Sequence, residues 1–361
     1  MSLPPPLARP LLPAALLLGA LAALGCYQPA APTNGAPAAV AADGSPGDYL
    51  FCFWNAENFF DDKVDGWKTH PDKEFDTWFA ADDGKVFRRK LDNLTEVLSS
   101  LNDGKGPDIL ALAEVETERS AEMLMESLNK AVGKRAAPYQ HVLWKNPHGG
   151  RNIATAILTR LPVEKGRTQL LGKRQRILEG HITVNGHDLV VIASHWTSRL
   201  REEGVGGRAH YADAIYGRFR AMYKSNPNVD LVVCGDFNDN PDDDSVLKHL
   251  HATGDLALVR KGGDEPHLFN LFAKRWERNR NEVGTHFHRG KWFIFDQIVL
   301  SPGMLRKPGW SWDEGSPAQI VRKLADDKGR PLSFGTAKQN KRRGASDHFP
   351  VTVRLHVAGA R

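Results

Sequence analysis

Residues 229–241 read VDLVVCGDFNDNP, and this stretch guides the interpretation of the whole chain. The apolar run up to Cys234 predicts a buried strand, which leads directly into Asp236 and Asn238. A carboxylate and an amide at the end of a buried strand stand on a rigid support, as catalytic and ligand-binding groups require. The stretch therefore predicts a functional site at the end of a core strand.

The same arrangement recurs along the chain, because other apolar strands also end in, or adjoin, a polar residue. These polar residues are Asn55, Glu114, His195, Asp296, and Asp347 with His348. Taken singly, an Asn or Asp at a strand end is usually a turn or cap residue. Strand ends on one edge of a layered protein converge, however, so six such placements together predict a single site.

The apolar spacing predicts an alternation of strands and helices without an internal repeat, which favours one large α+β domain. The polar stretch 61–83 is interpreted as a loop. Expected helices are 85–101, 117–131 and 207–224, and expected strands are 49–54, 108–113, 139–144, 152–159, 177–184, 188–194, 229–234, 292–295, 298–300 and 349–355.

Composition and charge exclude several classes of protein. With 41% hydrophobic and 25% charged residues, the 361-residue chain is neither disordered nor collagenous nor a coiled coil. A net charge of +5 is compatible with nucleic acid, phosphate esters or an acidic membrane surface, without selecting one. The three cysteines lack zinc-ligand spacing, and Cys52 and Cys234 fall in predicted core strands, which favours buried free thiols over a disulfide.

The amino-terminal segment predicts export. Residues 10–25 carry no charge, and they are too few for a membrane span of about 20 residues but suit a secretory signal. The run ends in Ala23-Leu24-Gly25-Cys26, which resembles a bacterial lipoprotein signal. We therefore expect a signal peptide over 1–25, a lipid on Cys26, a flexible tether over 26–47 and a single domain over 48–357. Ordinary signal cleavage and an uncleaved anchor are the alternatives. The expected location is the bacterial cell envelope or the exterior, with membrane contact through the lipid.

Seven blocks, in order, carry a family resemblance that spans about residues 49–356. They read FWNAENFF (53–60), DILALAEVE (108–116), RNIATAILTR (151–160), VIASHWTSR (191–199), VVCGDFNDNP (232–241), GTHFHRGKWFIFDQIVLS (284–301) and SDHFPV (346–351). The chain resembles the endonuclease/exonuclease/phosphatase superfamily, and the residues of these blocks are similar to those of its bacterial secreted branch. The resemblance implies a four-layered αββα sandwich of the deoxyribonuclease I type, and Mg²⁺- or Mn²⁺-dependent cleavage of a P–O bond.

The resemblance also implies roles for individual residues. The metal ligands would be Asn55, Glu114 and Asp347. The catalytic residues would be His195, Asp236, Asn238, Asp296 and His348, in which His348 acts as general base or transition-state histidine and Asp296 orients it. Asp236 and Asn238 would position the attacking water and bind the phosphate, to which His195 would also bind. Many relatives have Gln where this chain has Ala113, so a local hydrogen bond is expected to be missing.

The hydrolysis of a phosphodiester requires residues of these types, independently of the resemblance. Hydrolysis of a phosphodiester builds negative charge, which a hard divalent cation neutralises. Mg²⁺ prefers oxygen ligands and needs only one or two protein carboxylates, whereas zinc would call for a Cys/His set. A carboxylate behind a histidine fixes the tautomer and stabilises the imidazolium.

Several positively charged or aromatic residues are candidates for substrate contact. Arg199 and His286 are the two single candidates, and the spacing of His286 and His288 also admits a transition metal. Two basic runs adjoin the catalytic blocks and suit phosphate-backbone contact, although a solvated charged face is an equal alternative. They are Lys274, Arg275, Arg278 and Arg280 in one loop, and Lys338, Lys341, Arg342 and Arg343 in the other.

Three functions compete on this basis. The first is a metal-dependent phosphodiesterase, above all a nuclease, acting as a monomer on nucleic acid or another phosphate ester. The second is a phosphatase or a phospholipase- or sphingomyelinase-type esterase on lipid or inositol phosphates. The third is an inactive surface binding module, against which the complete set of eight polar residues argues. The two basic runs favour nucleic acid over a lipid.

Overall fold

The computed structural model describes residues 45–66, 72–148, 151–172, 174–199, 204–280, 282–306, 308–338 and 343–359. The chain divides into two units, residues 1–39 and 40–361, and all described residues lie in the second. The predicted signal peptide, Cys26 and most of the predicted tether lie outside the described residues and stay predictions. In the described part of the chain, no helix is long and apolar enough to cross a membrane.

The first of two seven-stranded sheets has the order β14-β16-β1-β2-β4-β3, with β15 also paired to β16. Its strands are β1 (Gly47–Phe59), β2 (Ile109–Val115), β3 (His141–Trp144), β4 (Ala154–Thr159), β14 (Trp310–Trp312), β15 (Gln319–Ile320) and β16 (Val351–Val357). β1 and β2 are parallel, whereas β16 runs antiparallel to β1.

The second sheet has the order β5-β6-β7-β8-β13-β10-β9. Its strands are β5 (Gln169–Leu170), β6 (Ile177–Val184), β7 (His187–His195), β8 (Asp230–Asp236), β9 (Ala252–Thr253), β10 (Leu268–Asn270) and β13 (Asp296–Leu300). A separate two-stranded hairpin consists of β11 (His286–His288) and β12 (Lys291–Phe293).

The described helices are α1 (Lys73–Ser99), α2 (Glu118–Val132), α3 (Gly204–Ser225), α4 (Leu256–Lys261) and α5 (Ala273–Arg278). Short helical turns lie at η1 (Gly133–Arg135), η2 (Lys165–Arg167), η3 (Ser245–His249) and η4 (Pro302–Leu305). Thr117 caps α2 by accepting a hydrogen bond from the backbone N–H of Ser120, which satisfies a donor that the first turn would otherwise leave free.

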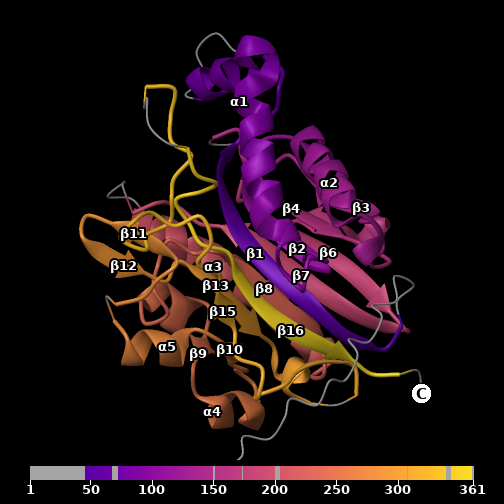
Figure 1. Ribbon diagram of the computed structural model, residues 1–361. Coiled ribbons are helices and arrows are strands. Elements are labelled where there is room, and N and C mark those ends of the chain that lie inside the picture. Colours follow the sequence, from indigo (N-terminus) through magenta and orange to yellow (C-terminus); the bar gives the residue numbers. More distant parts are fainter. Residues whose placement is uncertain are drawn as a thin grey trace, which may run out of the picture. The chain divides into compact units, whose positions relative to one another are not determined.

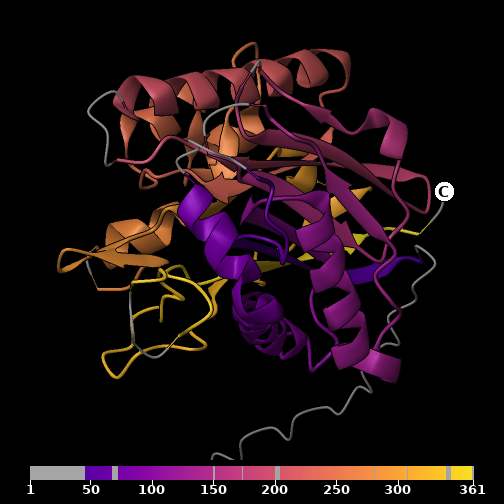
Figure 2. The same cartoon turned by 90° about the horizontal axis from the view of Figure 1, so that it is seen from above.

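Three apolar cores separate four layers. Phe51 on β1 and Val191 on β7 belong to the core between the two sheets. Trp54 on β1 packs with Phe87 of α1 on the outer face of the first sheet, and Phe219 of α3 covers the outer face of the second. Figures 1 and 2 show α1 and α2 against one sheet and α3 against the other. The fold is therefore the predicted αββα sandwich, and its central strands are continuous apolar runs because both of their faces are buried.

The two core thiols are free, as the sequence predicts. Cys52 lies on β1 and Cys234 on β8, and neither is exposed to solvent. Burial raises the pKa of both thiols above the ordinary value, so they stay protonated and pack as small apolar groups.

Three local expectations are wrong. α1 begins at Lys73, inside the stretch interpreted as a loop, because Phe75 and Phe79 pack into the core while charged neighbours mask the apolar spacing. Non-helical backbone angles from Ala81 to Gly84 then kink the helix. Three residues of the first basic run, Lys274, Arg275 and Arg278, lie in α5 rather than in a loop. The stretch 292–295 does not continue into Asp296 as one strand, since β12 pairs with β11 and β13 starts anew.

A buried ion-pair network on β6 ties the second sheet to α3. The Glu179 side chain is fully buried and accepts two hydrogen bonds of 2.7 Å from Nε and Nη2 of Arg218. Gln169 Nε2 at 2.8 Å and His181 Nε2 at 3.1 Å contact the same carboxylate. Burial alone would raise the pKa of Glu179, but the bonds from Arg218 and His181 outweigh burial and hold it at about 2.

We predict that Glu179→Gln lowers the free energy of unfolding at pH 7 by about 2–4 kcal/mol, because it breaks a buried ion pair. The pKa of Glu179 is below its ordinary value of 4.5, so its stabilisation is complete above pH 4.5 and is lost as the pH falls towards 2. Urea unfolding of both proteins between pH 7 and pH 3 measures the difference. A difference that does not shrink towards pH 3 would contradict this assignment.

Candidate active site

Three catalytic candidates lie in one row across the second sheet. His195 on β7 is paired with Asp236 on β8, and Asp236 is paired with Asp296 on β13. Directly opposed residues on neighbouring strands point to the same face, so the pairing brings the three side chains together. Each is at least 95% buried. The strand ends at 195 and 236 converge as the sequence predicts, whereas Asp296 stands at the start of its strand.

Two irregularities in the first sheet direct Asn55 and Glu114 into the same site. The β1–β2 register shifts between Asn55 and Phe59, and the β2–β4 register shifts between Ala113 and Val115. Glu114 itself has φ of 61°, an uncommon angle for a residue with a side chain. Such bulges re-aim side chains. β1 therefore continues to Phe59, and the expectation that it stops at Asn55 is wrong.

Asn55 joins the two sheets through a side-chain hydrogen bond. Its Nδ2 donates to Asp236 Oδ2 at 2.9 Å, and its Oδ1 accepts from the backbone N–H of Glu57 at 2.9 Å. Glu114 Oε2 accepts from the backbone N–H of Asn58 at 2.7 Å. Glu114 Oε1 lies 3.7 Å from His195 Nε2, which is too long for a hydrogen bond and leaves this oxygen available to a ligand.

His348 is surrounded by carboxylates. Its Nδ1 lies 2.7 Å from Asp296 Oδ2, and its Nε2 lies 3.8 Å from Asp236 Oδ2 and 4.0 Å from Asp347 Oδ1. Burial lowers the pKa of His348, but the charges of Asp296 and Asp236 outweigh burial and raise it well above the ordinary value. The ring is therefore an imidazolium at neutral pH.

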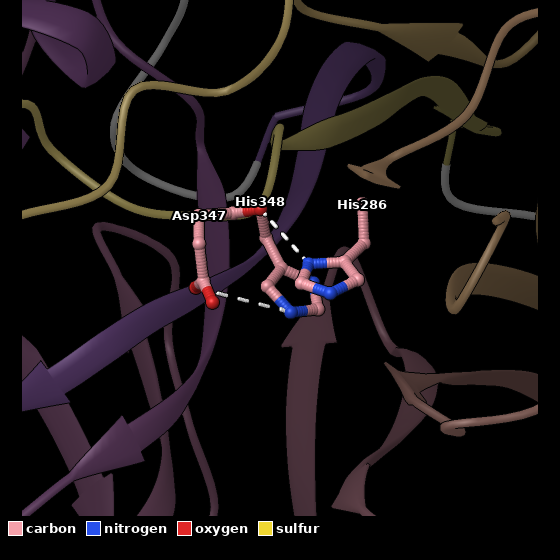
Figure 3. A group of neighbouring side chains, drawn as sticks. All are labelled: His286, Asp347 and His348. Atoms are coloured by element: carbon pink, nitrogen blue, oxygen red, sulfur yellow. Dashed lines mark hydrogen bonds and ion pairs between the residues drawn. The ribbon is translucent and has the colours of Figure 1, made fainter. Parts of the chain in front are cut away.

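His286 stacks on this imidazolium from the β11–β12 hairpin. The ring centroids of His286 and His348 lie 4.4 Å apart, and His286 Nδ1 donates to the carbonyl oxygen of Asp347 at 3.0 Å (Figure 3). Burial and the charge of His348 lower the pKa of His286 to about 4, so its ring is neutral. His286, Asp347 and His348 form a single group with ligand atoms within 4.8 Å, and that group is part of the active site.

His195 has the opposite protonation state to His348. Its Nδ1 lies 3.0 Å from Arg176 Nη1, and because a guanidinium only donates, Nδ1 accepts and the proton sits on Nε2. Burial, with the charge of Arg176, holds the pKa of His195 well below its ordinary value. The Nε2–H therefore faces Asp236 Oδ2 at 3.6 Å as a neutral donor.

Asn238 and Arg199 lie at the rim of this arrangement. The backbone N–H of Asn238 donates to Asp236 Oδ1 at 2.9 Å, and its side-chain Nδ2 donates to the carbonyl of Trp196 at 3.2 Å. Arg199 Nε donates to the carbonyl of Asn238 at 2.7 Å, and its Nη2 pairs with Asp239 at 2.6 Å. Arg199 thus supports the Asn238 turn, and its predicted phosphate contact stays a prediction.

Sequence reasoning missed a buried pair, Glu57 and Lys90, that positions the segment ending in Asp347. The Glu57 carboxylate accepts from the backbone N–H groups of Phe334 at 2.7 Å, Gly335 at 3.0 Å and Asp347 at 3.0 Å. Lys90 Nζ, which is fully buried, donates to the carbonyl of Glu57 at 2.9 Å. Burial raises the pKa of Glu57 to about 7 and lowers that of Lys90 to about 8. The signal was available: Lys90 follows Phe87 at helical spacing, on the buried face.

The family model described as the Endonuclease/Exonuclease/phosphatase family matches residues 50–357. The chain belongs to this family. It is therefore a phosphoric ester hydrolase, and members of this family typically depend on a divalent metal. No curated protein matches the sequence.

Several solved structures are similar to the chain. A humanised D. rerio TDP2 is 15% identical, covering 85% of this chain and 98% of its own, with a TM-score of 0.49. Sphingomyelinase C from Streptomyces griseocarneus is 13% identical, covering 86% and 99%, with a TM-score of 0.49. Beta toxin from Staphylococcus aureus, a mutant with bound magnesium ions, is 13% identical, covering 86% and 100%, with a TM-score of 0.47.

The oxygen donors of the site suit a hard divalent cation. Glu114 offers its Oε1, and Asn55 Oδ1 carries one hydrogen bond and retains a second lone pair. The side chain of Asp347 is 41% exposed, so its carboxylate can exchange solvent for an ion. One or two carboxylates suffice for Mg²⁺, which keeps several waters. The residues present therefore fit the metal that the family implies.

We predict that Lys90→Met lowers the free energy of unfolding by about 3–5 kcal/mol, because it removes the buried cation whose charge acts on the Glu57 carboxylate and leaves the backbone carbonyls of Glu57 and Ala345 without their donor. Glu57→Gln combined with Lys90→Met should cost clearly less than the sum of the two single changes. Urea unfolding of the four proteins measures this coupling, with Lys85→Met, an exposed change on the same helix, as the control. Additive effects would mean that the two charges do not depend on each other.

Proposed function

We propose that the chain is an Mg²⁺- or Mn²⁺-dependent phosphodiesterase that hydrolyses nucleic acid with activated water. The observation that supports it most strongly is the position of Asp236 Oδ2. This oxygen accepts from Asn55 at 2.9 Å and lies within 4 Å of the Nε2 atoms of both His195 and His348. A base, a neutral donor and a cationic donor thus meet around one oxygen atom.

Each of these side chains has a distinct task in the proposed reaction. Burial raises the pKa of Asp236, which makes it a better base for the attacking water. The water oxygen bonds to phosphorus, its proton passes to Asp236, and the bond from phosphorus to the leaving oxygen breaks. The imidazolium of His348 supplies the proton that the leaving oxygen takes up, and His195 Nε2–H donates to a nonbridging oxygen. The products are an alcohol and a phosphomonoester.

The metal would be held by Glu114, Asn55 and Asp347. A bound divalent cation supplies neutralisation of the negative charge on the phosphate oxygens. Lys90 lies beneath these ligands, and the charges of Glu114 and Asp347 act on its ammonium group. This buried cation limits the excess of negative charge in the site and supports a sparse ligand set.

The β11–β12 hairpin favours a polyanionic substrate over a bilayer. The hairpin starts at His286, beside the catalytic imidazolium, and turns at Arg289 and Gly290, which both have positive φ as a tight hairpin turn requires. Arg289 and Lys291 at this tip are exposed. A tip that enters a bilayer would carry apolar side chains instead. A nucleic acid that leaves the catalytic centre along the hairpin would meet both charges.

The two basic runs are less well placed for this role than the hairpin. In the first, Arg280 pairs with Asp242, and Arg275 is half-buried. In the second, Lys341 and Arg342 lie outside the described residues, and Arg343 donates to the carbonyl oxygens of Phe334 and Thr336. Their contact with phosphates stays a prediction.

We predict that EDTA abolishes hydrolysis of a small activated diester, and that Mg²⁺ or Mn²⁺ restores it while zinc alone does not. Glu114→Gln should raise the Mg²⁺ concentration needed for half-maximal rate by about 10-fold or more, because it removes a charged ligand. Glu118→Gln, an exposed change at the start of α2, is the control and should leave this concentration unchanged. Full activity in EDTA would refute the proposed metal dependence.

We predict that the full chain cleaves plasmid DNA or single-stranded RNA faster than sphingomyelin, an inositol polyphosphate or a simple phosphomonoester. Arg289→Ala with Lys291→Ala should lower kcat/KM on the polymer by about 10-fold and reduce the slope of its salt dependence by about 2, since two counterion-releasing contacts are lost. The small diester should be unaffected.

The control for this experiment removes two exposed charges elsewhere. Lys130→Ala with Lys134→Ala acts at the carboxyl end of α2, about 20 Å along the helix from its start beside the site. This pair should change neither rate nor salt dependence. Equal loss on polymer and small diester in the hairpin variant, or faster turnover of a lipid or an inositol phosphate, would refute the nuclease assignment.

A further inference from the structure

A second group of carboxylates lies outside the catalytic set. Asp65 follows β1, Asp76 lies in the first turns of α1, and Glu116 follows β2, so the three come from distant parts of the sequence. One carboxylate oxygen from each lies within 4.8 Å of the other two. Asp61 adjoins the group, because its backbone N–H donates to Glu116 Oε2 at 2.8 Å.

One oxygen in this group lacks the partner that its burial demands. Glu116 is only 2% exposed, and its Oε1 is buried without a hydrogen-bond partner among the residues that the structure describes. Native proteins satisfy nearly all buried polar atoms, because an unpaired one costs its full desolvation free energy. Glu116 Oε1 therefore marks a place where a ligand is expected.

A further carboxylate adjoins the group. Asp61 Oδ2 accepts from Thr117 Oγ1 at 2.9 Å, so its carboxylate is held beside Glu116. Two arginines of this part of the structure pair with other carboxylates: Arg119 with Asp62 at 2.9 Å, and Arg151 with Asp72 at 2.8 Å. Four carboxylates thus share this region.

We infer that Asp65, Asp76 and Glu116, with Asp61 beside them, bind a calcium ion at a site separate from the catalytic metal. All the donors are oxygens, which hard cations select and zinc does not. Ca²⁺ accepts several carboxylate ligands at about 2.3–2.6 Å, which suits a group of three or four carboxylates. Mg²⁺ holds opposite ligands only about 4.2 Å apart and takes one or two carboxylates.

The ion would join three elements next to the active site. Glu116 follows Glu114 by two residues, and Asp61 follows the end of β1 by two residues. Asp76 lies near the start of α1, on the helix that also carries the buried Lys90. Calcium at this position would fix the ends of β1 and β2 against α1, and would stabilise the fold without entering the reaction.

The test is calcium binding by the full chain after removal of metals with a chelator. Calorimetry should show one site for Ca²⁺ with a Kd of about 10⁻⁵–10⁻³ M, and saturating Ca²⁺ should raise Tm by about 5 °C. Mg²⁺ at the same concentration should raise Tm far less. Asp65→Asn, an exposed change that the fold tolerates, should weaken Ca²⁺ binding at least 10-fold, and Glu116→Gln should abolish the Tm shift.

Two control variants separate this site from its neighbours. Asp62→Asn alters an adjacent carboxylate that pairs with Arg119 and should keep the full calcium response. Glu114→Gln impairs the catalytic metal site and should also keep it. Calcium binding that survives both Asp65→Asn and Glu116→Gln, or that is lost in Glu114→Gln, would overturn the inference, as would the absence of any calcium response. Neither result would bear on the proposed phosphodiesterase activity, whose metal dependence is measured by turnover.

Discussion

The burial of one carboxylate, that of Asp236, is the constraint on which the arrangement of the site depends. A carboxylate that is only 2% exposed must find hydrogen-bond donors within the protein. Its Oδ1 accepts from the backbone N–H of Asn238, and its Oδ2 accepts from Asn55 on the other sheet. The second bond requires β1 and β8 to meet at one level, so the same interaction that satisfies the charge also sets the two sheets in register across the core.

The two histidines beside Asp236 differ in protonation state because groups of opposite charge contact their Nδ1 atoms. His195 and His348 present their Nε2 atoms to the same oxygen at 3.6 and 3.8 Å. A cation, Arg176, stands behind His195, whereas a carboxylate, Asp296, stands behind His348. The pKa of His195 therefore falls and that of His348 rises, although both rings are buried. Histidine thus supplies both a neutral and a cationic hydrogen-bond donor, and the proposed hydrolysis of a phosphate ester uses both.

The sequence predicts those parts of the site that follow from the local pattern of apolar and polar residues. It does not predict the parts that depend on contacts with backbone groups far away in the sequence. His195 and Asp236 follow apolar runs, and parallel strands bring such ends together, so their meeting is predictable. The role of Glu57 is not predicted, because its carboxylate binds backbone N–H groups about 280 residues away, which no local pattern reveals. The bulge at Glu114 is not predicted for the same reason, since the backbone irregularity arises only when the strands pair in the sheet. The start of α1 is not predicted, because charged residues surround the few aromatic residues that pack into the core.

The two carboxylate groups at this end of the fold differ in how their charge is balanced. In the catalytic site, the imidazolium of His348 and the buried ammonium of Lys90 lie among the carboxylates, so part of the negative charge is neutralised by the chain itself. Around Glu116 the structure records hydrogen bonds from Asp61 N–H and from Thr117, but a buried oxygen remains unpaired. Because a buried unpaired polar atom costs its desolvation free energy, the calcium ion that we infer would complete the second group, as a divalent cation would complete the catalytic one.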